Sequence, residues 1–579
     1  MPRTGFAMNV YSAAQYLLFL VIVTVCVKPL GGYMQRVFER RKTALDRLCL
    51  PAERWIYRLA GIDPSVEMDA AQYAIAFIVF GLIGTLLLYA ILRFQHFLPW
   101  FFPAYQTTPL SPDLAFNTAL SFSTTTTWQA YGGENTMSYF SQMVGLCVQN
   151  FLAGAAGLAV GIAFIRGLAR ESCATLGNFW VDLTRSLLWI LLPGALIGSL
   201  LLVWQGVPMN FHHYEVASTI EGTRQAIPQG PVAALEIIKN LGTNGGGFFN
   251  ANGAHPYENP TPLSNFLELL SIILLPAALT NTFGRMVQHL RQGWLLYWVM
   301  LFLFSGGLMV LHLSERQGNP FIHGADLGQS QLQAGGNMEG KEVRLGIGGS
   351  VLGGTVTSNG ATGSANAMAD SFSSLGGLML LVHLLLGEVI FGGLGTGLFG
   401  MIMTATIAVF LAGLMIGRTP EYLGKKIGPS ENKMIILYAL TGPVTVLILT
   451  AIAISTQAGL AGLTTNYGPH GLTEILFGFA SSFGNNGMAF ASLNANSPFY
   501  NIMTAIAMMA GRFGLAVTAL CFAGLVGRQK SVPASRGTLR TDSLTFGILL
   551  TAFLAIVTAL SYVPVLTLGP ILERLRYGI

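Results

Sequence analysis

The residues that most clearly indicate a binding site are clusters of Gly, Thr, Asn and Ser that interrupt long apolar stretches. One of them reads NLGTNGGGFFNAN over residues 240–252, with three consecutive glycines behind a Thr-Asn pair. Each glycine costs a helix about 1 kcal/mol relative to alanine, so this stretch predicts irregular backbone. Irregular backbone at membrane depth is tolerated only where protein or water satisfies its N–H and C=O groups. The cluster therefore predicts main-chain carbonyl groups that line a polar space.

Three further clusters share this pattern, and each follows a short semi-apolar stretch in a long loop. The four segments are DLAFNTALSFSTTTTWQAYGG from Asp113, PVAALEIIKNLGTNGGGFFNAN from Pro231, GIGGSVLGGTVTSNGATGSANAM from Gly346 and LTEILFGFASSFGNNGMAFASLNAN from Leu472. The second and fourth are closely alike, with GTNG and FFNAN matching GNNG and ASLNAN, so we interpret the segments as an internal repeat. For any one of them, an ordinary solvated connection is the alternative interpretation.

Four short helices that end in such clusters predict a cation site. The carboxyl end of a helix is the negative end of its dipole, and rings of carbonyl oxygens replace the hydration shell of K⁺ in a selectivity filter. Four segments of this kind, each between two spans, are able to converge on one axis around a dehydrated cation. Transport of a bulky organic substrate is disfavoured, because the apolar segments hold few charged residues to bind one.

The elements that must position these clusters are membrane-spanning helices. The chain has 579 residues, of which 52% are hydrophobic and only 10% are charged, against roughly 25% charged residues in a soluble domain. Apolar runs of about 20 residues, the length that crosses a bilayer, occur near residues 13–30, 70–93, 137–165, 187–205, 264–284, 294–313, 376–416, 434–458, 499–527 and 544–566. We therefore predict an all-α polytopic membrane protein with about ten transmembrane helices, the seventh broken by its glycines.

The positive charges predict how the chain is oriented. Lysine and arginine gather in alternate loops, most densely between Lys28 and Arg58, and such loops usually stay in the cytoplasm. The clusters lie in the intervening loops, which we expect to face outward. We expect the N-terminus outside, with the first span kept as an anchor because no small-residue cleavage site follows it. The formal net charge of +5 is small and gives no indication of nucleic acid binding.

Sequence motifs that would indicate a nucleotide site, a metal site or ATP hydrolysis are incomplete or absent in this chain. GTGLFG at residues 395–400 fits a dinucleotide-binding fingerprint, but no strand or βαβ pattern surrounds it. GGNMEGKE at residues 335–342 imitates a phosphate-binding loop, yet Glu342 stands where Ser or Thr must hold Mg²⁺. The five cysteines lack metal-ligand spacing, and the DKTGT sequence of P-type pumps is missing. We therefore expect no nucleotide site in this chain, and any ATP hydrolysis on a partner.

Four longer motifs carry a family resemblance. They are LGTNGGGFFNANGAHPYENPTPLSN from Leu241, FNTALSF…TWQAYGGE from Phe116, GEVIFGGLGTGL from Gly387 and IGRTPEYLGKKI from Ile416. These strings resemble the potassium-binding subunit (KdpA) family of the bacterial Kdp-type potassium-transporting ATPases. The resemblance implies ten spans in four membrane-pore-membrane repeats around a selectivity filter, a fold shared with the Trk, Ktr and HKT potassium transporters. It also implies a complex with a P-type ATPase catalytic subunit and two small membrane subunits.

The resemblance further implies a division of the chain and a set of filter residues. The chain divides into a first span with a basic cytoplasmic loop (1–69), pore repeats at 70–186, 187–293, 294–433 and 434–540, and a last span with the C-terminal tail (541–579). The filter triplets are Thr125, Thr126 and Thr127; Thr243, Asn244 and Gly245; Ala361, Thr362 and Gly363; and Asn485, Asn486 and Gly487. The first reads TTTTWQ where the family usually has TNTNWQ, and the third reads Ala-Thr-Gly for Ser-Cys-Gly. Coordination by carbonyl oxygens survives both changes, whereas side-chain contributions to selectivity need not.

Further residues are expected beside the ion path. Gln129 follows the first triplet, where its amide either holds the loop or caps the turn. For Arg418, the family resemblance implies a role in plugging the inner vestibule, and the alternative is an ordinary positive-inside anchor. Glu388 and Arg512 lie within apolar stretches, where an unpaired charge costs roughly 3 kcal/mol, so each is expected to face water or a partner. Glu388 adjoins the glycine run that is expected to break the seventh span, and the family resemblance implies that an ion turns sideways there toward the ATPase subunit. His383 in the same span is interpreted as a packing residue.

These observations favour a potassium-selective translocating subunit of an ATP-driven uptake complex in the bacterial inner membrane. Such a subunit binds extracellular K⁺ in a four-loop filter and passes it to a P-type ATPase subunit, without hydrolysing ATP itself. The alternative is a free-standing K⁺ channel or ion-coupled symporter with the same pore fold. A membrane scaffold with glycine-rich outer loops is the alternative that involves no transport.

Overall fold

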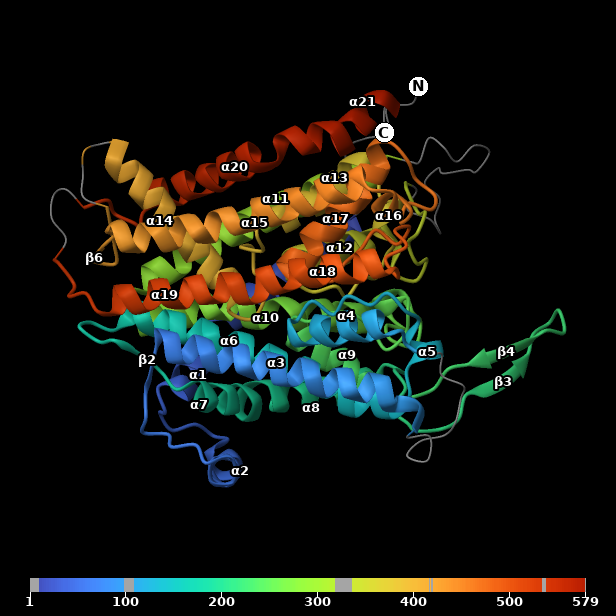
Figure 1. The fold of residues 1–579 in the computed structure, drawn as a ribbon, viewed down its shortest axis with the longest axis horizontal. Coiled ribbons are helices and arrows are strands. Elements are labelled where there is room, and N and C mark those ends of the chain that lie inside the picture. Colours follow the sequence, from blue (N-terminus) through green and yellow to red (C-terminus); the bar gives the residue numbers. More distant parts are fainter. Residues whose placement is uncertain are drawn as a thin grey trace.

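The computed structural model describes residues 10–97, 109–317, 336–415, 417, 420–533 and 538–577 (Figure 1). Within these residues, ten helical segments are long and apolar enough to cross a membrane. They are α1 (Val10–Phe38), α3–η1 (Ala70–Phe97), η3–α6 (Ser141–Ala169), α7–η4–α8 (Phe179–Trp204), α10 (Pro262–Met286), α11 (Leu290–Glu315), α14 (Thr396–Met415), α15 (Pro429–Ser455), α18–η7–α19 (Pro498–Gly527) and α20–η8–α21 (Leu544–Arg576). The prediction of an all-α membrane protein with about ten spans is confirmed.

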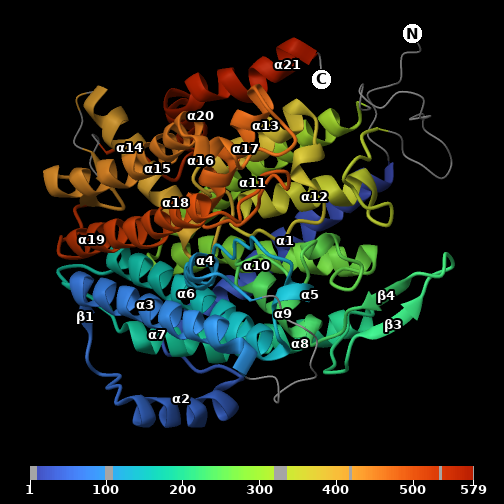
Figure 2. The same cartoon turned by 45° about the vertical axis from the view of Figure 1, so that its right-hand side comes forward.

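Burial separates the centre of this bundle from its rim. The most apolar window of the η3–α6 span is 83% buried and that of α10 is 72% buried, against 22% for α1 and for the α20 span. The rim helices expose rows of leucine, isoleucine and valine, which is the surface that lipid tails require. In both views, α10 runs near the middle of the bundle (Figures 1 and 2). The central helices are therefore the ones that support polar elements inside the membrane.

Four short helices lie between the spans. They are α4 (Pro112–Ser123), α9 (Val232–Leu241), α12 (Gly346–Asn359) and α17 (Pro469–Gly484). α4 and α17 begin with proline, whose missing N–H would have no helical partner at that position. α12 forms despite its glycines, because almost all of its residues are buried and packing outweighs helix propensity. Each repeat predicted from the sequence contains one of these helices, although the exact repeat boundaries stay a prediction.

The seventh span is broken, as its glycines predict. α13 (Ser374–Leu385) ends ten residues before α14 begins, and the two helices are joined by irregular backbone. Five residues of this connection have positive φ, namely Gly387, Glu388, Phe391, Gly393 and Gly395. The break places irregular main chain and the Glu388 side chain in the interior, because residues 388–395 are all buried.

The remaining elements are shorter than the spans, and α2 (Asp46–Ala60) lies alongside the span that contains α7 and α8 (Figures 1 and 2). The other helices are α5 (Gly133–Thr136), η5 (Asn252–Ala254), η6 (Ala369–Ser371) and α16 (Gln457–Leu460). The antiparallel strand pairs are β1 (Met68–Asp69) with β2 (Thr175–Gly177), β3 (Glu215–Ser218) with β4 (Arg224–Ile227), and β5 (Glu421–Tyr422) with β6 (Lys425–Lys426). The β3–β4 hairpin projects beyond the bundle at the end that also holds α5 and α16 (Figure 1).

Candidate functional site

The four triplets adopt the same backbone turn. Each closely follows its short helix, and its first residue has a φ of 64° at Thr125, 51° at Thr243, 51° at Ala361 and 56° at Asn485. The middle residues each donate their N–H to the carbonyl five residues earlier, namely Thr126 to Ser121 (3.0 Å), Asn244 to Lys239 (2.8 Å), Thr362 to Thr357 (3.3 Å) and Asn486 to Ser481 (2.9 Å). Residues other than glycine adopt a positive φ in only a few per cent of cases. Its recurrence at four equivalent positions indicates one shared structural requirement.

Contacts between the triplets close them into a ring. A methyl group added to Gly245 would lie 2.2 Å from the Gly363 nitrogen, and one added to Gly363 would lie 2.6 Å from the Gly487 carbonyl carbon. A methyl group on Gly487 would lie 2.0 Å from the Thr126 carbonyl oxygen. The Thr127 hydroxyl donates to the Asn244 carbonyl (2.7 Å), which links the first triplet back to the second. Segments more than a hundred residues apart in the sequence therefore surround one axis.

The ring separates two cavities. On one side, a vestibule of about 820 Å³ is lined by residues from every loop, including Thr127, Gly363 and Gly487. On the other side, a cavity of about 10 Å³, which has room for roughly one water-sized sphere, is lined by the first residue of every triplet. The four middle residues are all 0% exposed. A small cation that moves from one cavity to the other would have to pass between the triplets.

Side chains of the triplets bond to the surrounding scaffold. The Asn485 amide donates to the Thr126 hydroxyl (3.0 Å), and the Asn486 amide donates to the Thr357 carbonyl (2.7 Å). The Thr243 hydroxyl accepts a hydrogen bond from the Leu394 N–H in the helix break (2.9 Å). These bonds hold three of the triplet side chains in place, whereas the Asn244 side-chain amide has no hydrogen-bond partner in the described part of the chain. Main-chain carbonyls are the groups that replace the hydration shell of K⁺ in a selectivity filter. Which of these atoms bind an ion stays a prediction.

Gln129 holds the loop of the second repeat. Its amide nitrogen donates to the Gly247 carbonyl (3.0 Å) and to the Tyr131 hydroxyl (2.9 Å), while its amide oxygen accepts from the Gly247 N–H (2.8 Å). Of the two roles weighed from the sequence, the geometry matches support of a filter loop rather than capping of its own turn. The Gln129 amide thus bonds to both the N–H and the C=O of Gly247, which fixes the main chain of this residue next to the vestibule.

Glu388 and Arg512 meet at the inner cavity. Glu388 comes from the helix break and Arg512 from η7 (Ala510–Gly514), a π-helical segment of the ninth span, and both line the cavity under the ring. Glu388 Oε1 has no hydrogen-bond partner in the described part of the chain, while Arg512 Nη2 donates to the Ala153 carbonyl (2.8 Å). The cavity therefore combines one carboxylate and one guanidinium directly beneath the triplets.

Two further residues were singled out from the sequence, Arg418 and His383. Arg418 falls outside the described residues, so its suggested role in the inner vestibule stays a prediction. His383 is buried, and its Nδ1 shares a hydrogen bond with the Ser358 hydroxyl of α12 (2.9 Å). This contact agrees with the interpretation of His383 as a packing residue behind the third triplet.

A buried charge cluster behind the second triplet is missing from the sequence predictions. Lys239 of α9 is 0% exposed, and its ammonium forms ion pairs with Glu236 (2.8 Å) and Glu258 (3.1 Å). The same ammonium donates to the Gly246 carbonyl (2.6 Å), and Glu258 accepts from the Phe249 N–H (2.6 Å). The cluster thus fixes the main chain on the outer side of the triplet. The sequence does contain a pattern that could have indicated this cluster, namely a glutamate and a lysine three residues apart in an otherwise apolar stretch.

Comparison with protein-family models decides where this architecture belongs. The model described as KdpA, potassium-transporting ATPase A subunit, matches residues 17–575. The chain belongs to the KdpA family. The resemblance predicted from the four sequence motifs is thereby confirmed.

Members of the KdpA family are similar to this chain over nearly its whole length. The chain is 51% identical over 561 residues to the potassium-transporting ATPase potassium-binding subunit of Methylobacterium nodulans, covering 97% of both chains. It is 50% identical over 580 residues to the subunit of the same name from Sorangium cellulosum, covering 98% of this chain and 100% of the other. The subunit from Koribacter versatilis is 48% identical over 580 residues, covering 97% and 98%.

A solved structure extends the relationship at the level of the fold. The potassium transporter TrkH from Vibrio parahaemolyticus superposes with a TM-score of 0.50 at 12% sequence identity, covering 88% of this chain and 97% of TrkH. The fold of this KdpA family member is therefore similar to that of TrkH, as the sequence resemblance implied.

Proposed function

We propose that this chain is the potassium-translocating subunit of an ATP-driven high-affinity uptake complex. The observation that carries the proposal is the ring of four equivalent turns between an outer vestibule and an inner cavity. Carbonyl oxygens arranged around an axis replace the water shell of K⁺ without charged ligands. The relatives are named potassium-binding subunits of potassium-transporting ATPases, which supports potassium as the ion.

The proposed path runs from the vestibule through the triplets to the inner cavity. There the Glu388 carboxylate offers a negative charge to an arriving cation, whereas Arg512 offers a positive charge that opposes direct passage inward. The break between α13 and α14 adjoins this cavity through Gly393 and Leu394. An ion held beside Glu388 therefore leaves most readily sideways along the break, toward a partner subunit.

The proposed partners and location follow from the same reasoning. ATP hydrolysis belongs to a P-type catalytic subunit, and two small membrane subunits complete the complex. The complex resides in the bacterial inner membrane, with the N-terminus and the vestibule outside. The positive-inside distribution of lysine and arginine supports this orientation.

Growth of a bacterium that lacks its own potassium uptake systems tests this function. We expect the chain to restore growth at low external K⁺ only when the catalytic and small subunits are co-expressed. A matched control complex carries a catalytic subunit whose phosphorylated aspartate is replaced by asparagine, and this complex is expected to fail. Rescue by the chain alone, with no effect of the partners, would contradict the proposal and favour a free-standing channel or symporter.

A further inference from the structure

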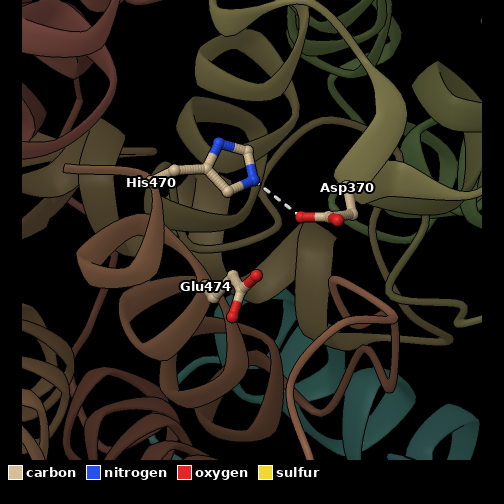
Figure 3. Close-up of side chains that lie close together, drawn as sticks. All are labelled: Asp370, His470 and Glu474. Carbon is tan, nitrogen blue, oxygen red and sulfur yellow. Dashed lines mark hydrogen bonds and ion pairs between the residues drawn. The ribbon is translucent and has the colours of Figure 1, made fainter. Parts of the chain in front are cut away.

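A cluster of three side chains that could hold a metal ion lies outside the triplets, and Figure 3 shows Asp370, His470 and Glu474 together. Asp370 belongs to η6, which follows the third triplet, while His470 and Glu474 are one helical turn apart at the start of α17. The potential ligand atoms of the three side chains all lie within 4.8 Å of one another. His470 Nε2 is 2.6 Å from Asp370 Oδ1. Two different pore repeats thus contribute to one small cluster.

Glu474 supplies an independent indication of a ligand. Glu474 is 0% exposed, and its Oε1 accepts a hydrogen bond from the Asn466 amide (2.7 Å). Its Oε2 has no hydrogen-bond partner in the part of the chain that the structure describes. The carboxylate faces the space between His470 and Asp370 (Figure 3). A buried carboxylate oxygen without a donor is unfavourable, and a cation at this point would satisfy it.

The surroundings of the cluster match those of metal ligands. A histidine that binds a metal through one ring nitrogen usually donates the other N–H to a carboxylate or carbonyl, and ligating carboxylates are themselves hydrogen-bonded. His470 Nδ1 lies 3.0 Å from Glu573 Oε1. The Ser492 hydroxyl donates to Asp370, and the Asn466 amide reaches Asp370 (3.2 Å) as well as Glu474. Each of the three ligands is thereby oriented by a second residue.

We propose that Asp370, His470 and Glu474 bind a divalent transition-metal ion of the Zn²⁺ class. One imidazole and two carboxylates with an open position for water are a donor set that Zn²⁺ accepts, whereas Ca²⁺ and Mg²⁺ prefer oxygen ligands alone. Ligands about 2.1 Å from a tetrahedral ion lie about 3.4 Å apart. The His470 Nε2–Asp370 Oδ1 distance of 2.6 Å would therefore have to lengthen by about 0.8 Å when the ion binds. The ion takes the place of the proton on His470 Nε2, and this proton goes to solvent.

The ion would join three parts of the outer face. It ties η6 of the third repeat to α17 of the fourth, and through Glu573 it holds the α21 end of the last span. Phe490, whose ring stacks on His470 with centroids 5.8 Å apart, also lines the vestibule. The His470 side chain retains 21% exposure, so the cluster is not sealed from solvent.

Zinc titration of the tag-free full-length chain tests the proposal. The detergent-purified protein is stripped with a chelator and titrated with Zn²⁺ in competition with a chromophoric chelator, and Co²⁺ serves as a spectroscopic probe. We expect one tightly bound equivalent and the visible absorption of a four-coordinate Co²⁺ site. Glu474→Gln and His470→Gln are expected to remove both signals. Glu573→Gln, which alters only the orienting carboxylate, is expected to weaken binding about 10- to 100-fold.

His213→Gln is the matched control, because His213 is exposed in the outer loop before β3, away from the cluster. It should bind Zn²⁺ like the unmodified chain. Size-exclusion profiles and metal-free unfolding temperatures establish that the Gln variants are folded. Absence of a stoichiometric site in the unmodified chain, or unchanged Zn²⁺ affinity in folded Glu474→Gln, would overturn the proposal and leave the cluster as a salt-bridged contact between repeats.

Discussion

Replacing Gly245 with aspartate is expected to weaken the potassium affinity of uptake by at least about 100-fold, because the new side chain has no room beside the ring. Its Cβ would lie 2.2 Å from the Gly363 nitrogen, and the residue has a φ of 96° that disfavours any Cβ. Overpacking alone costs about 1–3 kcal/mol, burial of a carboxylate adds several more, and 1.4 kcal/mol corresponds to a factor of ten. The K⁺ concentration that half-saturates uptake by the complete complex measures the effect.

Two companion variants separate the causes of this loss. Gly222→Asp introduces the same side chain at a glycine that also has positive φ (80°), but with no atom within 4 Å of the added Cβ, and it should leave uptake unchanged. Gly245→Ala keeps the clash without the charge and should fall between the two. Potassium uptake by folded Gly245→Asp with unaltered affinity would show that Gly363 and its neighbours do not form the ion path.

Lys239→Met is expected to destabilise the chain by about 3–5 kcal/mol, the usual cost of removing one partner from a buried ion pair. Burial alone would lower the pKa of Lys239, but the carboxylates of Glu236 and Glu258 raise it above its ordinary value, so the ammonium stays charged. Without it, two buried carboxylates lose their counter-charge and the Gly246 carbonyl loses its donor. Denaturant-induced unfolding in detergent micelles measures the change in the free energy of unfolding.

The appropriate comparison is Lys426→Met, because Lys426 is exposed on β6 at the other end of the bundle. This variant should lie within about 0.5 kcal/mol of the unmodified chain. The double variant Lys239→Met/Glu258→Gln should recover part of the stability, since it also removes one uncompensated carboxylate. Equal stability of Lys239→Met and Lys426→Met would mean that the buried cluster does not hold the second loop.

The membrane-spanning helices were predictable from the sequence, because their positions depend on local hydropathy. Each span needs a long apolar run, so the ten spans follow from local composition. The glycines of FGGLGTGLFG also predicted the break that ends where α14 begins at Thr396. The short helix α12 was also placed correctly, although its glycines favour coil, because the repeat pattern indicated a helix before each polar cluster.

Features that depend on distant residues were not predictable in this way. Lys239 meets Glu258 only because the loop after the second triplet folds back over α9. Asp370 and His470 are a hundred residues apart and share no motif, so their contact requires the packing of two repeats. Local sequence also gives no information on how one triplet abuts the next, since that arrangement depends on the packing of the central helices. Gln129 illustrates the limit, because its position suggested two roles and only the bonds to Gly247 separate them.

The central claim is that main-chain oxygens of four loops surround a potassium ion at one axis. An experimental density map of the complex in K⁺, repeated with Rb⁺ so that anomalous scattering identifies the ion, tests it most directly. The account predicts a monovalent cation between the triplets, coordinated by carbonyl oxygens around Thr126, Asn244, Thr362 and Asn486. A well-ordered ring with no Rb⁺ signal at its axis, and Rb⁺ bound elsewhere in the chain, would contradict it.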